Sequence, residues 1–129
     1  MSQAEQDRRM DYIEFQTTDV EGSKKFYSEI FGWEKTGAMD MGEMGTYQMY
    51  GPAGHPDFSY GGMMNKPAHI PGPPFWVYYI MVKDLDDAGA RVVEGGGEVQ
   101  TGPMEVPGGD RIAYCMDPQG AAFALHAKG

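Results

Sequence analysis

The chain has 129 residues, of which 41% are hydrophobic and 22% charged, a composition typical of a single globular domain. Its formal net charge is −9 and its ten basic residues are scattered, which argues against a nucleic-acid partner because a phosphate backbone is bound by clustered Lys and Arg. There is no apolar run of about 18 residues and no apolar signal core near the start, so we expect neither a membrane-spanning helix nor secretion. The single cysteine, Cys115, cannot form an internal disulfide, which predicts a reducing cytoplasmic location.

The first predicted elements form a strand, a helix and three further strands. In the first strand, polar and apolar residues alternate, so Ile13, Phe15 and Thr17 lie on one face and Tyr12, Glu14 and Gln16 on the other. A helix follows that is capped by Asp19 and ended by Gly32, with an apolar stripe of Phe26, Tyr27, Ile30 and Phe31. Glycine-rich turns then separate strands predicted at 33–40, 46–51 and 57–64.

The same pattern returns at an offset of 65 residues, which carries Asp19 onto Asp84. Between the copies, the proline-rich segment 65–74 is predicted to be a stiff linker. The second helix is capped by Asp84 and ended by the glycines 95–97, and its apolar stripe is Ala88, Val92 and Val93. Strands are predicted at 98–103, 111–116 and 121–127.

Each half therefore has the order β-α-β-β-β, and each is too small to bury a good core alone. We predict an α+β fold in which the two modules pair into a cup-shaped, mostly antiparallel sheet with the helices on its outer face. The predicted organisation is a polar tail at 1–10, a first module at 11–64, the linker at 65–74 and a second module at 75–129, all within one structural domain.

Two stretches carry a resemblance to a known family. The first is "TTDVEGSKKFYSEIFGWE" at 17–34, and the second is "DPQGAAFALH" at 117–126. Both resemble the vicinal oxygen chelate superfamily, also called the glyoxalase/bleomycin resistance/dioxygenase superfamily. The resemblance covers the chain from about Asp11 to its end and implies the fold more specifically than the activity, because this scaffold hosts unrelated chemistries.

The resemblance also implies four metal-facing positions, two in each module. In this chain the four positions hold Tyr12, Ser59, Val77 and Ala124. If the alignment of the two repeats is shifted by a few residues, the position of Ser59 is taken by one of the residues from Tyr60 to Met64. Metals of this kind take nitrogen and carboxylate ligands, which these four side chains lack. We therefore expect no metal and no other cofactor.

Other side chains are candidates for binding or catalysis, and each also has a purely structural interpretation. Glu14 shares a strand face with Tyr12 and is a candidate general base or anchor for a cation, or else an acid that bonds a neighbouring tyrosine. His126 lies on the face of Ala124 and is a candidate acid/base or displaced ligand, or else it frays near the chain end. Cys115 is expected to be a packed core thiol. The eleven methionines are either adaptable walls for a ligand or core filler.

The sequence thus favours a metal-free protein that binds a small aromatic or cationic organic molecule. The alternative is an enzyme. It would be a glyoxalase-like lyase or isomerase, or a dioxygenase relative, and it would use either an atypical metal site or Glu14 as acid and base. We expect a homodimer, since small paired sheets leave strand edges exposed. The predicted ligand-binding residues are Tyr12, Glu14, Gln16, Ser59, Val77, Tyr79, Met81 and Ala124.

Overall fold

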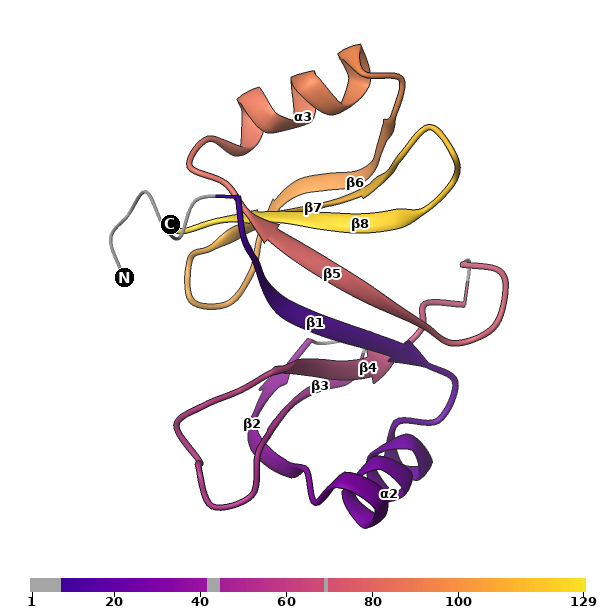
Figure 1. Ribbon diagram of the computed structural model, residues 1–129, viewed down its shortest axis with the longest axis vertical. Coiled ribbons are helices and arrows are strands. Elements are labelled where there is room, and N and C mark those ends of the chain that lie inside the picture. The colour runs from indigo at the N-terminus through magenta and orange to yellow at the C-terminus, as the bar shows by residue number, and fades with distance from the viewer. Residues whose placement is uncertain (1–7, 42–44, 69) are drawn as a thin grey trace. The chain divides into compact units, whose positions relative to one another are not determined.

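A computed structural model describes residues 8–41, 45–68 and 70–129 (Figure 1). The described residues follow the order β-α-β-β-β twice, which confirms the predicted α+β class. The first copy has β1 (Met10–Thr17), α2 (Val20–Phe31), β2 (Glu34–Asp40), β3 (Thr46–Gly51) and β4 (Gly61–Asn65). The second copy has β5 (Phe75–Met81), α3 (Leu85–Glu94), β6 (Glu98–Glu105), β7 (Arg111–Met116) and β8 (Ala122–Ala127). Neither helix is long and apolar enough to cross a membrane, within the described ranges.

The chain divides into two compact units whose boundaries cut through β1 and β5. The N-terminal unit is Ile13–Trp76, and the C-terminal unit combines Val77–Gly129 with the residues up to Tyr12. The residues just before β1 contact the end of β5 within the C-terminal unit, where the Arg8 amide donates to the Met81 carbonyl at 2.6 Å. The predicted tail at 1–10 falls mainly on residues outside the described part of the chain, and Met10 already belongs to β1.

In the N-terminal unit the strands lie in the order β2-β3-β4-β1. β1 pairs with β4 in parallel, and the β2/β3 and β3/β4 pairs are antiparallel. Helix α2 is capped by Asp19, whose carboxylate accepts from the Gly22 amide at 3.0 Å, and it ends at the left-handed Gly32, both as predicted. The hydrophobic core of the N-terminal unit consists of Phe15, Val20, Tyr50 and Met63, packed against the partly buried Tyr27, Trp33 and Trp76.

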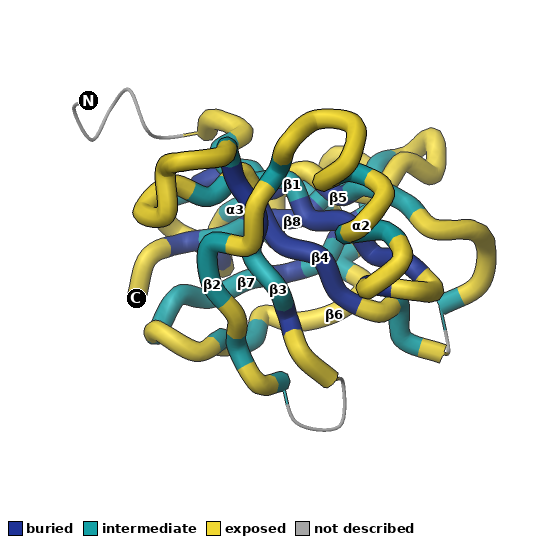
Figure 2. Tube along the Cα trace, turned by 90° about the horizontal axis from the view of Figure 1, so that it is seen from below, coloured by how far each residue is buried: buried dark blue, intermediate teal, exposed yellow. Residues whose placement is uncertain are grey.

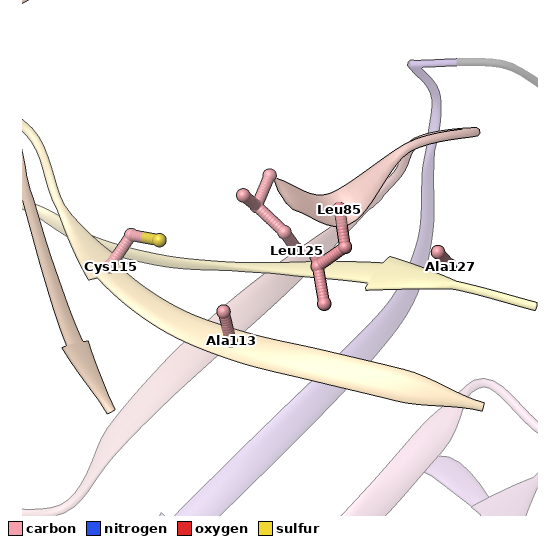
Figure 3. Close-up of a cluster of buried hydrophobic side chains, with 5 residues drawn as sticks. All are labelled: Leu85, Ala113, Cys115, Leu125 and Ala127. Carbon is pink, nitrogen blue, oxygen red and sulfur yellow. The ribbon is translucent and has the colours of Figure 1, made fainter. Parts of the chain in front are cut away.

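In the C-terminal unit the order is β5-β8-β7-β6. β5 and β8 are parallel, and the β8/β7 and β7/β6 pairs are antiparallel, so antiparallel pairing predominates in both units as expected. Asp84 caps α3 by accepting from the Asp87 amide at 3.0 Å. The core between α3 and the sheet contains Leu85, Ala113, Cys115, Leu125 and Ala127 (Figure 3).

Several predicted details are wrong. The stripe on α2 is mostly exposed, since Phe26, Ile30 and Phe31 have exposed fractions of 55%, 53% and 59%. The sheet buries Val20 and partly covers Tyr27, which lies seven residues further along one line of the helix, and residues on either side of this line stay uncovered. On α3, Ala88 and Val92 pack as predicted, but Val93 is exposed.

The strand predicted at 57–64 begins only at Gly61, because the preceding residues form turns in which the Phe58 amide donates to the His55 carbonyl. Asn65 is part of β4, so the connection without helix or strand starts at Lys66. β6 extends two residues further than predicted, to Glu105, through two irregularities in its pairing with β7. Figure 2 shows β4 as a largely buried strand and α2 as mostly exposed or half-buried.

Candidate functional site

A row of three residues crosses the C-terminal sheet on the face opposite α3. Tyr79 of β5 and Tyr114 of β7 are the register partners of Ala124 on β8, one on each side. The Tyr79 hydroxyl donates to the Tyr114 hydroxyl at 2.9 Å, and the two ring centroids are 6.1 Å apart. Ala124 itself is fully buried, with an exposed fraction of 0%. The two side chains therefore meet above the methyl group of Ala124, an arrangement that we call the tyrosine bridge.

The tyrosine bridge bears directly on the metal position that the family resemblance implies. A glutamate at position 124 would extend into the space that the two rings occupy. Val77 and Met81, on the same face of β5, are buried and apolar. Among residues 8–41, 45–68 and 70–129, no three His, Cys, Asp or Glu side chains come together as a group that could hold a metal ion. The residues at these positions do not fit a divalent metal, because they offer no imidazole or carboxylate ligand.

Next to the tyrosine bridge, the same unit contains a histidine–carboxylate pair. His126 Nε2 lies 2.7 Å from Asp11 Oδ1, and their side chains are 14% and 21% exposed. The His126 ring is 6.0 Å from the Tyr79 ring, and Tyr12 meets Tyr79 edge to face at 5.5 Å. The expectation that His126 frays is therefore wrong, since β8 and Asp11 both hold it. Imidazole paired with carboxylate is a common acid/base arrangement.

In the N-terminal unit, Glu14 and Gln16 occupy the face of β1 opposite α2, as the alternation predicted. They are 2% and 5% exposed, and Gln16 Nε2 donates to Glu14 Oε2 at 2.8 Å. Glu14 is the register partner of Gly62 on β4. A side chain on Gly62 would collide with the Tyr47 ring, so that ring lies against the Gly62 backbone on this face. The unit thus presents a buried acid and amide beside a tyrosine.

Ser59 does not occupy the strand position that the repeat assigned to it. It precedes β4 and its hydroxyl shares a hydrogen bond with that of Thr36. Glu14 and Tyr79 are equivalent by the offset of 65, and their partners on the last strands are Gly62 and Ala124. The repeat offset is therefore shorter by three residues at the last strand, and Gly62 is the equivalent of Ala124.

The remaining candidates are mostly structural. Cys115 is 1% exposed in the core below α3, and burial raises the pKa of its thiol, which opposes reactivity. Trp76 stacks on Phe15 at 4.3 Å, and the Tyr50 hydroxyl donates to the Ile13 carbonyl, so both belong to the core below α2. His55 is exposed, whereas His69 and Met44 lie outside the described residues.

Sequence reasoning missed Tyr114, Tyr47 and Asp11. Tyr114 could have been found, because it precedes the buried Cys115 on a strand and so must point to the opposite face. Tyr47 could have been found in the same way, because it alternates with Gln48 along β3. The contact of Asp11 with His126 joins residues more than a hundred positions apart and leaves no local signal.

Comparisons with known proteins agree with this fold. The family described as the Glyoxalase/Bleomycin resistance protein/Dioxygenase superfamily matches residues 9–125. A putative glyoxylase, CFP32, of Mycobacterium bovis is 34% identical over 116 residues, which cover 88% of this chain and 43% of the relative. The anthracycline biosynthesis protein DnrV of Streptomyces peucetius is 34% identical over an alignment of 136 positions, gaps included, that covers 92% of this chain and 46% of the relative.

Solved structures support the fold alone, because their sequence identities are low. Methylmalonyl-CoA epimerase of Streptomyces coelicolor superposes with a TM-score of 0.70 at 19% identity, with 95% of each chain covered. A hypothetical protein of Bacillus halodurans gives 0.72 at 16% identity, again with 95% of each chain covered. The chain spans less than half the length of the curated relatives that it matches. With nearly its whole length matched, the chain belongs to the glyoxalase/bleomycin resistance protein/dioxygenase superfamily.

Proposed function

We propose that this protein binds a small aromatic or cationic organic molecule without using a metal. The observation that carries the proposal is the tyrosine bridge, because two hydrogen-bonded phenol rings above Ala124 fill the position where the family resemblance implies a metal ligand. A site built from rings and hydroxyls suits a flat organic molecule better than an ion.

The face of the C-terminal unit supplies apolar and aromatic contacts. Val77, Tyr79, Met81 and Ala124 are buried on this face, and Tyr12 meets Tyr79 edge to face. Aromatic rings favour edge-to-face and offset-stacked partners, while phenol hydroxyls exchange hydrogen bonds with ligand oxygens. Methionine adapts its shape to a ligand. These properties favour an aromatic molecule that carries oxygen substituents.

The face of the N-terminal unit supplies the acidic contribution. Glu14, held by Gln16, would attract a cationic group, and the net charge of −9 favours the approach of cations. Ser59, already bonded to Thr36, is the least supported member of the predicted binding set.

The relatives give independent support for an aromatic ligand. DnrV, named for anthracycline biosynthesis, is 34% identical to this chain, so an anthracycline is a reasoned first probe. A quaternary ammonium compound is the matching probe for the cationic interpretation. We propose no nucleic-acid or membrane partner, and a reducing cytoplasm would suit the buried Cys115.

Calorimetric titration with both probes tests the proposal, together with mass spectrometry of molecules that copurify with the protein. Tyr79→Phe should weaken binding of the aromatic probe, and Glu14→Gln should weaken binding of the ammonium probe. Tyr78→Phe is the matched control, because Tyr78 is 47% exposed on the other face of the same strand. Stoichiometric metal in untagged protein, with loss of stability on chelation, would overturn the metal-free proposal.

An enzyme is the second candidate, either a glyoxalase-like lyase or isomerase or a dioxygenase relative. Two observations favour it: the buried Glu14 is oriented by Gln16, and His126 is paired with Asp11. The relative CFP32 carries the name putative glyoxylase. Turnover of an α-keto aldehyde or a thioester that is lost in both Glu14→Gln and His126→Asn would favour this candidate over binding alone.

A further inference from the structure

The N-terminal unit contains a groove between α2 and the start of β2. The chain turns at the left-handed Gly32, so that β2 begins beside the helix that precedes it (Figure 1). The groove has a volume of about 420 Å³, within the range of roughly 300–1,000 Å³ that is usual for small-molecule sites. Its lining residues are Lys24, Lys25, Ser28, Trp33, Glu34 and Lys35. Trp33 packs with Phe15, so the groove lies on the face of the sheet opposite Glu14 and Gln16.

The groove gathers positive charge in a chain that is acidic overall. Three of its six lining residues are lysines, although the whole chain has only ten basic residues and a net charge of −9. Lys24 and Lys25 lie four and three positions before Ser28, so these side chains share one flank of α2. The one acid among the six is Glu34, which accepts from the Gly54 amide at 3.5 Å.

A closed set of hydrogen bonds fixes Lys24 in the wall of the groove. Its ammonium group lies 3.0 Å from Gln48 Oε1 and 3.0 Å from Glu21 Oε2, and Gln48 Nε2 donates to Glu21 Oε1 at 2.9 Å. The hydrogen bonds from Gln48 and Lys24 hold the pKa of the Glu21 carboxyl below its usual range, so this carboxylate stays charged in mildly acidic solution. An ammonium group has three N–H donors, and these two contacts leave one of them for a ligand.

Lys35 and Ser28 add further donors. Within residues 8–41, 45–68 and 70–129, no group forms a hydrogen bond or ion pair with either side chain. Lys25 is 4.0 Å from Glu29 and both are largely exposed, so this ion pair is weak and Lys25 can turn towards a ligand. The groove therefore combines one fixed cation with two that can adjust their positions.

Aromatic side chains form the inner wall of the groove. Tyr27, Trp33 and Tyr50 line its narrow inner end together with Met63. The Trp33 ring is stacked with those of Tyr27 and Tyr50, at centroid distances of 5.4 and 4.9 Å, so the wall is firmly packed. The inner end has a volume of about 10 Å³, roughly the space of one water molecule, so a ligand would lie against the wall and not enter it.

We propose that this groove binds a small aromatic molecule that carries an oxyanion, either a phosphate or a carboxylate. Lysine ammonium groups bind such oxyanions as compact point charges, through hydrogen bonds that are stronger than those between neutral groups. The rings beside the lysines favour an aromatic carrier over an inorganic ion. The required charge is opposite to that of the cation expected at Glu14, so the groove is a second site, and it stands whether or not the first binds a ligand.

Amide and indole chemical-shift mapping of the full chain by NMR tests the site. Phenyl phosphate and benzoate should both shift the Trp33 indole signal and the amide signals of residues 24–28, and the probe that binds more tightly identifies the oxyanion. Phenol and inorganic phosphate should each bind at least about fivefold more weakly than this probe, because each lacks one half of the ligand. Shifts confined to β5 and β8 would place the probes at the other proposed site and would overturn this one.

Lysine variants test the role of charge. Lys35→Gln should weaken binding of the tighter probe by about fivefold or more, and Lys35→Arg should retain most of the affinity because it keeps the charge. Lys83→Gln is the matched control, since it removes the same charge from an exposed position in the C-terminal unit and should change the affinity by less than about twofold. Far-UV circular dichroism verifies that the variants remain folded. An equal loss in Lys35→Gln and Lys83→Gln, or an unshifted Trp33 signal at about 10 mM of both aromatic probes, would overturn the proposal.

Discussion

Replacing Ala124 with glutamate tests whether the tyrosine bridge closes this position. Ala124 is fully buried and flanked in register by Tyr79 and Tyr114, whose hydroxyls are 2.9 Å apart. A glutamate side chain has no room below this hydrogen bond. It must separate the two rings, and its carboxylate then stands among apolar neighbours such as Val77 and Met81.

The expected cost follows from these contacts. Inserting extra atoms into a packed site costs about 1–3 kcal/mol. Loss of the Tyr79–Tyr114 hydrogen bond adds about 1 kcal/mol. A partly desolvated carboxyl group adds a further ~1–3 kcal/mol. Together these contributions lead us to expect that Ala124→Glu lowers the free energy of unfolding by roughly 3–7 kcal/mol, a large part of the stability of a domain of this size. Tyr79→Phe, which removes only the hydroxyl, should cost about 1 kcal/mol.

Urea unfolding followed by circular dichroism measures these differences. The decisive comparison is a double-mutant cycle between Ala124→Glu and Tyr114→Ala. Because Tyr114 is only half-buried, its truncation is tolerable and makes room for the glutamate, so the cost of Ala124→Glu should fall by at least about 1 kcal/mol in that background. Strict additivity of the two changes, or a loss below about 0.5 kcal/mol for Ala124→Glu alone, would refute the idea that the two rings close this position.

Two further predictions concern neighbouring glycines and the buried thiol. In urea unfolding, Gly61→Ala should lower the free energy of unfolding by more than about 3 kcal/mol, because its Cβ would lie 1.6 Å from the backbone oxygen of Ile13. Gly62→Ala meets only the movable Tyr47 ring and should cost about 1–3 kcal/mol. The reverse order of the two costs would contradict the β1/β4 register. Burial raises the pKa of Cys115, so the folded state favours its protonated thiol. The stability advantage of the wild type over Cys115→Ala should therefore shrink as the pH rises through the unfolded-state pKa of about 8.5 towards the higher folded-state pKa. Labelling of the native protein by iodoacetamide as fast as that of the urea-unfolded chain would contradict this.

Local signals in the sequence were sufficient for much of the fold. The caps at Asp19 and Asp84 are set by short carboxylates that reach the amides of the next helical turn. The alternation along β1 places Glu14 and Gln16 on one face, because successive residues of a strand point to opposite sides. Such features depend on residues a few positions apart, and the repeat shows them twice.

Features that depend on tertiary contacts could not be obtained in this way. The strict offset of 65 placed the equivalent of Ala124 at Ser59, and the allowed slip included Gly62 without selecting it. The loop before β4 differs in length from its counterpart, which shifts the offset by three residues. The stripe on α2 was expected to be buried, because a helical apolar pattern does not reveal how much of its width a small sheet covers.

The row formed by Tyr79, Ala124 and Tyr114 shows why the absence of a metal-ligating side chain at position 124 must be interpreted together with the residues beside it. A long acidic side chain at position 124 and a closed pair of tyrosines beside it compete for the same space. Alanine is small enough for the rings to meet, and the rings in turn seal the alanine from water, so each residue type makes the other favourable. Changing one alone leaves either a collision or an uncovered gap, and both destabilise a packed sheet face. In a superfamily whose members share a fold, the residues that flank a ligand position in register are therefore as informative about its chemistry as the position itself.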